Sequence, residues 1–189
     1  MTRPPLFRLV AAAAAALALA APARAQVDER TYSVPGRGKL TMSVPAAWFD
    51  EPRTGPTGIP TVRFFDRIEN PKTFDMSVTI VWTPPGASPY ASPGPLRELV
   101  QQAATDVAPG ALERQLPVLE FAMENGSGFL FRATAKNAQP GEPTYLTRGA
   151  LASGDLMITF TILTAERGDP AVAQAIKMLQ SARRAPGAP

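Results

Sequence analysis

Apolar and polar residues alternate along several short segments of the chain, and this period of two is typical of half-buried β-strands. The alternation predicts strands over residues 39–45, 61–66 and 74–82. In the longest of the three, every second side chain is large and apolar: Phe74, Met76, Val78, Ile80 and Trp82. Each strand should therefore bury one face and leave the other face polar.

A β-hairpin is predicted between residues 117 and 136. Two apolar segments flank Asn125-Gly126, and this dipeptide favours a two-residue type I′ turn. Such a turn places Phe121 opposite Leu130 on the neighbouring strand.

A second hairpin is predicted from residues 145–153 and 156–164, joined at Gly154. The last of these strands is largely apolar on both faces, unlike the strands before it. A strand of this kind is covered on both sides, so the pattern predicts a packing layer above and below the sheet.

Two further segments place their apolar residues at helical spacing. The first starts with Pro95 in its first turn, ends before Pro109 and has an apolar stripe of Leu96, Leu99, Val100, Ala103, Ala104 and Val107. The second starts with Asp169 as N-cap and Pro170 as first helical residue. Its apolar stripe consists of Val172, Ala175, Ile176 and Leu179.

Together these elements predict the α+β fold class: a mainly antiparallel sheet of six or seven strands with helices packed on both faces, an α/β/α sandwich. The Pro-rich segments 52–60 and 84–95 interrupt the pattern and are predicted as loops. We find neither an internal repeat nor a second set of elements. Residues 26–184 should therefore form a single domain, followed by a flexible tail at 185–189.

The first 25 residues have the composition of a cleaved secretory signal peptide. Two arginines precede an apolar run at residues 9–20, and Ala23 and Ala25 supply the small residues of a signal-peptidase site. Cleavage is predicted between Ala25 and Gln26. The apolar run is shorter than the roughly 20 residues of a membrane-spanning helix, so no integral membrane segment is expected after cleavage. The mature protein should be periplasmic, or alternatively secreted.

Removal of the signal peptide changes the charge balance. The whole chain has 19 basic and 16 acidic residues and a net charge of +3. The signal holds three of the arginines and no acidic residue, so the mature chain has 16 basic and 16 acidic residues. A neutral chain whose aromatic residues follow strand patterns does not have the pattern of nucleic-acid binding, and no nucleic-acid partner is expected.

The absence of histidine and cysteine excludes several classes of chemistry. Neither a Ser–His nor a Cys–His nucleophile can be assembled, and no imidazole or thiolate is present to bind zinc. Phosphate-binding and dinucleotide-binding glycine motifs are also missing, so no cofactor, no metal site and no catalytic residue is predicted. A hydrolase built on carboxylates alone would need two acids that converge, such as Asp66 and Glu69, which could meet in a turn.

Three charged residues in predicted strands are the candidates for binding. Arg132 and Arg148 each lie among apolar neighbours, where a buried guanidinium must be paired. Glu120 or Glu124 could supply the carboxylate, and the simplest interpretation is a structural ion pair near a strand end. The alternative is that the arginines contact an anion or a partner in a groove between sheet and helix.

Two N-terminal segments and the order of the elements carry a family resemblance. The segments are Tyr-Ser-Val-Pro-Gly-Arg-Gly-Lys-Leu at residues 32–40 and a Val-Pro-x-x-Trp pattern from Val44 to Trp48. With the strands and helices that follow, as far as Arg183, the chain resembles the PsbP-like fold family of small exported bacterial proteins. That fold is shared by the PsbP subunit of photosystem II and a Ran-binding nuclear import factor.

The resemblance implies an antiparallel sheet between helices, with Trp48 as a core anchor, and an accessory or binding role without enzymatic activity. Neither photosystem docking nor Ran binding is carried over, because no segment matches either role and function does not follow from fold.

The function predicted from the sequence is therefore a non-catalytic, exported accessory or protein-binding module of the bacterial cell envelope, with an envelope protein as partner. The alternative is a periplasmic protein that binds a small ligand or an anion in a groove rimmed by the two Pro-rich loops. The sequence gives no indication of the oligomeric state or of the partner's identity.

Overall fold

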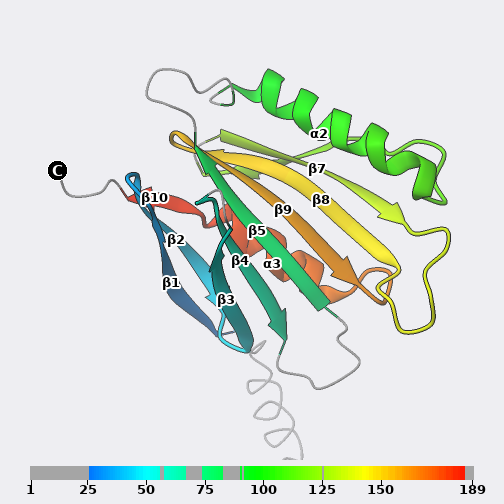
Figure 1. Cartoon of the computed structure of the whole chain (residues 1–189), viewed down its shortest axis with the longest axis horizontal. Helices are drawn as coiled ribbons and strands as arrows, with labels where there is room; N and C mark the ends of the chain where they lie inside the picture. The colour runs from blue at the N-terminus through cyan, green and yellow to red at the C-terminus, as the bar shows by residue number, and fades with distance from the viewer. Residues whose placement is uncertain are drawn as a thin grey trace, which may run out of the picture.

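Ten β-strands, two α-helices and one short 3-10 helix make up the described part of the chain (Figure 1). The computed structural model describes residues 26–55, 58–66, 74–82, 90, 92–124 and 126–185. The predicted signal peptide, residues 1–25, and residues 186–189 of the predicted tail lie outside these ranges.

Seven strands form one large antiparallel sheet in the order β3-β4-β5-β9-β8-β7-β6. They are β3 (Trp48–Thr54), β4 (Pro60–Asp66), β5 (Phe74–Trp82), β6 (Leu119–Met123), β7 (Gly126–Thr134), β8 (Tyr145–Ser153) and β9 (Leu156–Thr164). This sheet confirms the predicted number and direction of the strands.

A second antiparallel sheet has three strands in the order β1-β2-β10. They are β1 (Val27–Val34), β2 (Gly38–Pro45) and β10 (Arg183–Ala185). Of these, only β2 is predicted by the alternation. The strand β10 includes Ala185, where the sequence predicts the tail to begin.

The helices lie on opposite faces of the large sheet, as predicted (Figure 1). Helix α2 (Pro93–Val107) continues into the 3-10 helix η3 (Ala108–Gly110) and packs on β7 and β8. Helix α3 (Pro170–Gln180) packs on β9 and β2, so it lies on the same side as the small sheet. Asp169 caps α3, since its carboxylate accepts a hydrogen bond of 2.8 Å from the Ala171 amide.

Two hydrophobic cores result from this layering. The larger joins the small sheet, α3 and the face of the large sheet that carries Phe64, Met76, Ile80, Ile158 and Phe160. The smaller joins α2 to Phe129, Phe131, Ala133, Ala150 and Met157. The strand β9 contributes to both cores, which explains why its sequence is apolar on both faces.

Trp48, the first residue of β3, is a core residue, as the family resemblance implies. It is 4 % exposed and its ring lies 4.4 Å from that of Phe74, centroid to centroid. Trp48 is therefore a packing residue at the start of β3.

Two ion-pair clusters connect the small sheet to the large one. Arg30 of β1 pairs with Asp50 of β3. Arg184 of β10 pairs with Asp155 at 2.7 Å, and Arg37 reaches the same carboxylate at 3.5 Å. All five side chains are half-buried, so loss of one partner would leave a partly desolvated charge.

The β6–β7 hairpin is confirmed, but its predicted register is wrong. The structure pairs Phe121 with Gly128 and Leu119 with Leu130. The Phe121 ring lies over Gly128, with its Cζ 2.2 Å from where a Cβ would stand, and it packs edge-on against Phe160 at 6.1 Å. This aromatic packing selects a register shifted by two residues, which leaves each side chain on its original face.

The first Pro-rich segment is a loop only in its middle part, because Pro52–Thr54 belong to β3 and Pro60 to β4. β3 continues to Thr54 and β4 begins at Pro60, so the turn between them is short. Proline is tolerated here because β3 is an edge strand of the sheet, where a missing N–H need not break a ladder hydrogen bond. Most of the second Pro-rich segment lies outside the described residues, and its last three residues belong to α2.

Candidate functional site

Helix α2 covers only part of the face of the large sheet on which it lies. Helix α2 covers the part of this face that belongs to β7 and β8, and the part on β3, β4, β5 and β9 is left partly accessible. We call this part, with the adjoining Arg148, the open face. Its side chains are Phe49, Glu51, Arg53, Thr61, Arg63, Phe65, Asp75, Ser77, Thr79, Thr159, Thr161 and Leu163.

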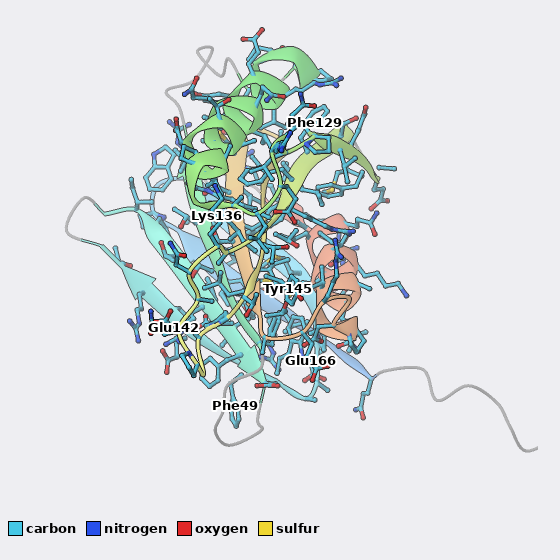
Figure 2. All side chains as sticks on the ribbon, turned by 90° about the vertical axis from the view of Figure 1, so that its right-hand side faces the viewer. Phe49, Phe129, Lys136, Glu142, Tyr145 and Glu166 are labelled. Atoms are coloured by element: carbon cyan, nitrogen blue, oxygen red, sulfur yellow. The ribbon has the colours of Figure 1, made fainter. Side chains whose placement is uncertain are left out.

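An aromatic pair lies at the β3 edge of the open face. The rings of Phe49 and Phe65 stack with centroids 5.6 Å apart, and Phe49 remains 43 % exposed. Figure 2 shows Phe49 at the end of the molecule opposite α2. An exposed, stacked aromatic pair on a rigid sheet is the kind of anchor that protein interfaces use.

Arg63 extends the aromatic pair with a fixed positive charge. Its Nε donates to both carboxylate oxygens of Asp75, at 2.9 and 3.0 Å, and its guanidinium carbon lies 5.8 Å from the centre of the Phe65 ring. The hydrogen bond to Asp75 raises the pKa of Arg63 above its usual value, against a smaller opposing effect of burial. The guanidinium is therefore held in one orientation beside the two rings.

Arg148 lies in the same cross-strand row as Arg63. The row runs from Glu51 through Arg63, Ser77 and Thr161 to Arg148. Its side chain is exposed and borders a small apolar cavity of about 130 Å³ beneath α2. Arg148 forms no ion pair with any described residue.

Arg132 points to the opposite side of the sheet from Arg148. It pairs with Thr147 in the β7–β8 ladder and lines a cavity of about 350 Å³ where α3 begins. We call this space the α3 cavity. Arg167 and Asp169 border it from the segment that leads into α3.

Glu113 is a further acidic residue beside the α3 cavity. Its carboxylate accepts hydrogen bonds from the Thr134 amide at 2.8 Å and from the Thr134 hydroxyl at 2.6 Å. Burial raises the pKa of the Glu113 carboxyl, but these hydrogen bonds and the charge of Arg167 outweigh it, so the pKa lies below its usual value. Glu113 is ionised at neutral pH and attaches the segment after η3 to the end of β7, where the Leu112 amide also donates to the Thr134 carbonyl at 2.8 Å.

The ion pairs that the sequence predicts for Arg132 and Arg148 are not formed. The carboxylate of Glu120 accepts a hydrogen bond from Ser127 across the hairpin instead. Both arginines are exposed rather than buried, so neither needs a carboxylate to offset desolvation. Glu124 likewise forms no ion pair with a described residue.

The predicted groove between the Pro-rich loops is not tested, because most of the second loop lies outside the described residues. The two arginines lie on opposite faces of the sheet, and no described residue of either Pro-rich segment lines the α3 cavity or the cavity beside Arg148. The sequence analysis missed Phe49, Arg63, Glu113 and Arg167. Of these four residues, only Arg63 could have been found from the sequence. The alternation in β4 and β5 places Arg63 and Asp75 on the polar face of adjacent strands.

The described residues contain neither a group of metal ligands nor a membrane-spanning helix. No group of three or more acidic side chains there is arranged to hold a metal ion. No helix within the described ranges is long and apolar enough to cross a membrane. The possible carboxylate pair of Asp66 and Glu69 is not seen, since Glu69 lies outside the described residues.

The fold is that of an α+β sandwich built on a seven-stranded antiparallel sheet, with an open face and a cavity on opposite sides. It is similar to the solution structure of cyanobacterial PsbP (CyanoP) from Synechocystis, with a TM-score of 0.54 and 16 % sequence identity over 87 % of this chain and 96 % of that chain. It also matches the crystal structure of the Ran-binding protein Mog1p of Saccharomyces cerevisiae, with a TM-score of 0.47 and 12 % identity over 84 % and 96 % of the two chains.

The similarity to cyanobacterial PsbP confirms the PsbP-like fold that the element order predicts. Comparison of the sequence with models of protein families gives no match, and comparison with curated proteins gives none. At 16 % identity the likeness establishes the fold alone, because proteins of one fold differ in their partners.

Proposed function

We propose that the protein is a non-catalytic, exported module of the bacterial cell envelope that binds a protein partner through its open face. The observation that carries this proposal is the stacked pair of Phe49 and Phe65 beside the fixed guanidinium of Arg63. Aromatic residues and arginine are enriched at protein interfaces and among the residues that supply most of the binding energy.

The rigidity of the surface supports the same conclusion. The open face is formed by four hydrogen-bonded strands, and Arg53 and Arg63 are already paired with Glu51 and Asp75. A partner would therefore meet side chains that are largely ordered before binding, which lowers the entropic cost of association. Arg148 adds a positive charge that no described residue neutralises, and a carboxylate of the partner would complement it.

The absence of histidine and cysteine supports a binding role over a catalytic one, because the commonest general base and the thiol nucleophile are both missing. The signal-like composition of residues 1–25 supports export.

Export predicts a defined N-terminus for the mature protein. Expressed in a Gram-negative host, the chain should be recovered from the periplasm with Gln26 as its first residue, because signal peptidase recognises the small residues Ala23 and Ala25 and cleaves after Ala25. Intact-mass measurement and N-terminal sequencing check this. Replacing Ala25 by a bulky residue, Ala25→Phe, should cause the full-length precursor to accumulate. A cytoplasmic product that keeps residues 1–25 would contradict the prediction.

Partner binding is tested by crosslinking and affinity capture of the tagged mature protein from its native envelope. We expect one partner to be recovered reproducibly, and the double variant Phe49→Ala, Arg148→Ala to reduce its recovery about tenfold or more, as loss of a central interface residue does. The matched control is Leu112→Ala, because Leu112 is also an exposed apolar residue, at 61 %, but lies away from the open face.

The control variant should recover the partner at the wild-type level. Equal recovery by the double variant, or an equal loss with Leu112→Ala, would show that the open face is not the binding surface. Circular dichroism spectra establish that all variants keep the fold, which is expected because the replaced side chains are exposed.

A further inference from the structure

The α3 cavity brings together two positive charges from distant parts of the chain. Arg132 comes from β7 and Arg167 from the turn before α3, and both line the same space of about 350 Å³. Neither guanidinium forms an ion pair with a residue in the described ranges. The cavity lies at the lower end of the size range of small-molecule sites, about 300–1,000 Å³.

The two carboxylates at the cavity already accept hydrogen bonds, and the charge of Glu113 also interacts with that of Arg167. Glu113 accepts both of its hydrogen bonds from Thr134, and Asp169 accepts one from the Ala171 amide as the cap of α3. Each acid therefore stabilises a strand end or a helix end. The two arginines keep their hydrogen-bond donors available for a ligand.

Thr147 contributes a hydroxyl to the lining of the α3 cavity. Thr147 is only 5 % exposed, and its side chain forms no hydrogen bond with any described residue. The other buried threonine, Thr164, donates its hydroxyl to the Glu166 carbonyl at 3.2 Å. The Thr147 oxygen is not among the enclosed, unsatisfied polar atoms of the described residues, so it is accessible from the cavity and its hydroxyl can donate to a ligand there.

We propose that the α3 cavity binds a small molecule through an oxyanion group, a carboxylate or a phosphate. Arg132 and Arg167 would donate to the oxyanion from two sides, and the Thr147 hydroxyl would donate from the floor. Guanidinium groups match the planar carboxylate and the phosphate in geometry, which makes the contact stronger than one with a neutral ligand. This site is separate from the open face, since Arg132 and Arg148 lie on opposite sides of the sheet.

The test is a titration of the full mature protein with inorganic phosphate, glycerol 3-phosphate, succinate and citrate at constant ionic strength. Binding is followed by calorimetry and by the rise in melting temperature, which grows with ligand concentration when only the folded state binds. We expect saturable binding of at least one probe. Binding of the two phosphates or of the two carboxylates shows which kind of oxyanion the cavity accepts.

Three variants locate the binding. Arg132→Gln and Arg167→Gln should each reduce the affinity for the bound probe about tenfold or more, because each removes a charged hydrogen-bond donor. Thr147→Val should also weaken binding, because it replaces the hydroxyl by a methyl group of similar size and so removes a hydrogen-bond donor from the cavity.

The matched control is Arg148→Gln, which removes an unpaired arginine from the neighbouring position of the same ladder but on the other face. It should bind the probes as the wild type does. No saturable binding of any probe, or equal losses for Arg132→Gln and Arg148→Gln, would overturn the proposal, the latter because it indicates attraction by net charge alone. Partner capture by Arg132→Gln separates this result from the open face, since that variant should still recover the partner.

Discussion

Replacing Gly149 by alanine should destabilise the protein by about 3 kcal/mol or more, because the added methyl group has no space. A Cβ at this position would lie 2.1 Å from the Phe129 carbonyl oxygen and 2.6 Å from the Phe160 ring. The first contact is with backbone of the adjacent strand β7, which cannot move without breaking the β7–β8 ladder. Urea denaturation followed by circular dichroism measures the change in the free energy of unfolding.

Gly94→Ala is the matched control for this substitution. Gly94 lies in the first turn of α2, and a Cβ there would meet no atom within 4 Å. Because alanine is favoured over glycine within helices by up to about 1 kcal/mol, the control should be neutral or stabilising. A Gly149→Ala protein within 1 kcal/mol of wild type, roughly the scatter of such measurements, would contradict the steric argument.

The substitution Phe131→Ala should cost about 3–5 kcal/mol, the range found for truncating buried aromatic residues. Phe131 is fully buried, at 0 % exposure, in the smaller core between α2 and the sheet. Its loss would leave a cavity beneath α2 and weaken the attachment of the helix. Chemical denaturation gives the stability, and hydrogen exchange of the α2 amides shows whether the helix opens separately from the sheet.

Phe49→Ala makes the same chemical change at an exposed position and should cost less than about 1 kcal/mol. The contrast separates two positions of phenylalanine in this protein: Phe131 is buried in the smaller core, and Phe49 is 43 % exposed on the open face. Equal destabilisation by both variants would mean that the open face belongs to the core. It would also remove the basis of the proposed function.

The sequence predicted those elements whose pattern is local. The alternation around Met76 and Val78 and the apolar stripe from Leu96 to Val107 correspond to β5 and α2. The apolar character of β9 on both faces predicted a packing layer on each side of the sheet, and both layers are present. These patterns can be recognised because burial of one or both faces of an element determines which of its positions are apolar.

Elements that depend on distant contacts were not predicted. β10 has three residues and no alternation that could be recognised, and it is a strand only because β2 offers a free edge. β1 is mostly polar, and its Arg30 is held by a partner in β3. The hairpin register followed Phe121 packing on Gly128 and Phe160 rather than the turn dipeptide, so local turn preference was overridden by tertiary contact.

The candidate site was predicted only in part, because a sequence does not show which face of a strand is covered. Arg132 and Arg148 were singled out as charged residues among apolar neighbours, yet both are exposed and lie on opposite sides of the sheet. The α3 cavity also needs Arg167, which belongs to a turn and has no periodic pattern. Its position follows from the packing of α3 on β9, which brings that turn beside β7 and β8.

The position of β10 has a consequence for the order of events during biogenesis. β2 pairs on one side with β1, which is adjacent in sequence, and on the other with Arg183–Ala185, at the far end of the described chain. Arg183 also pairs with Glu29 of β1 at 2.7 Å. The small sheet therefore cannot be completed until residues 183–185 have been synthesised. Until then one edge of β2 keeps unpaired backbone groups that another strand could bind.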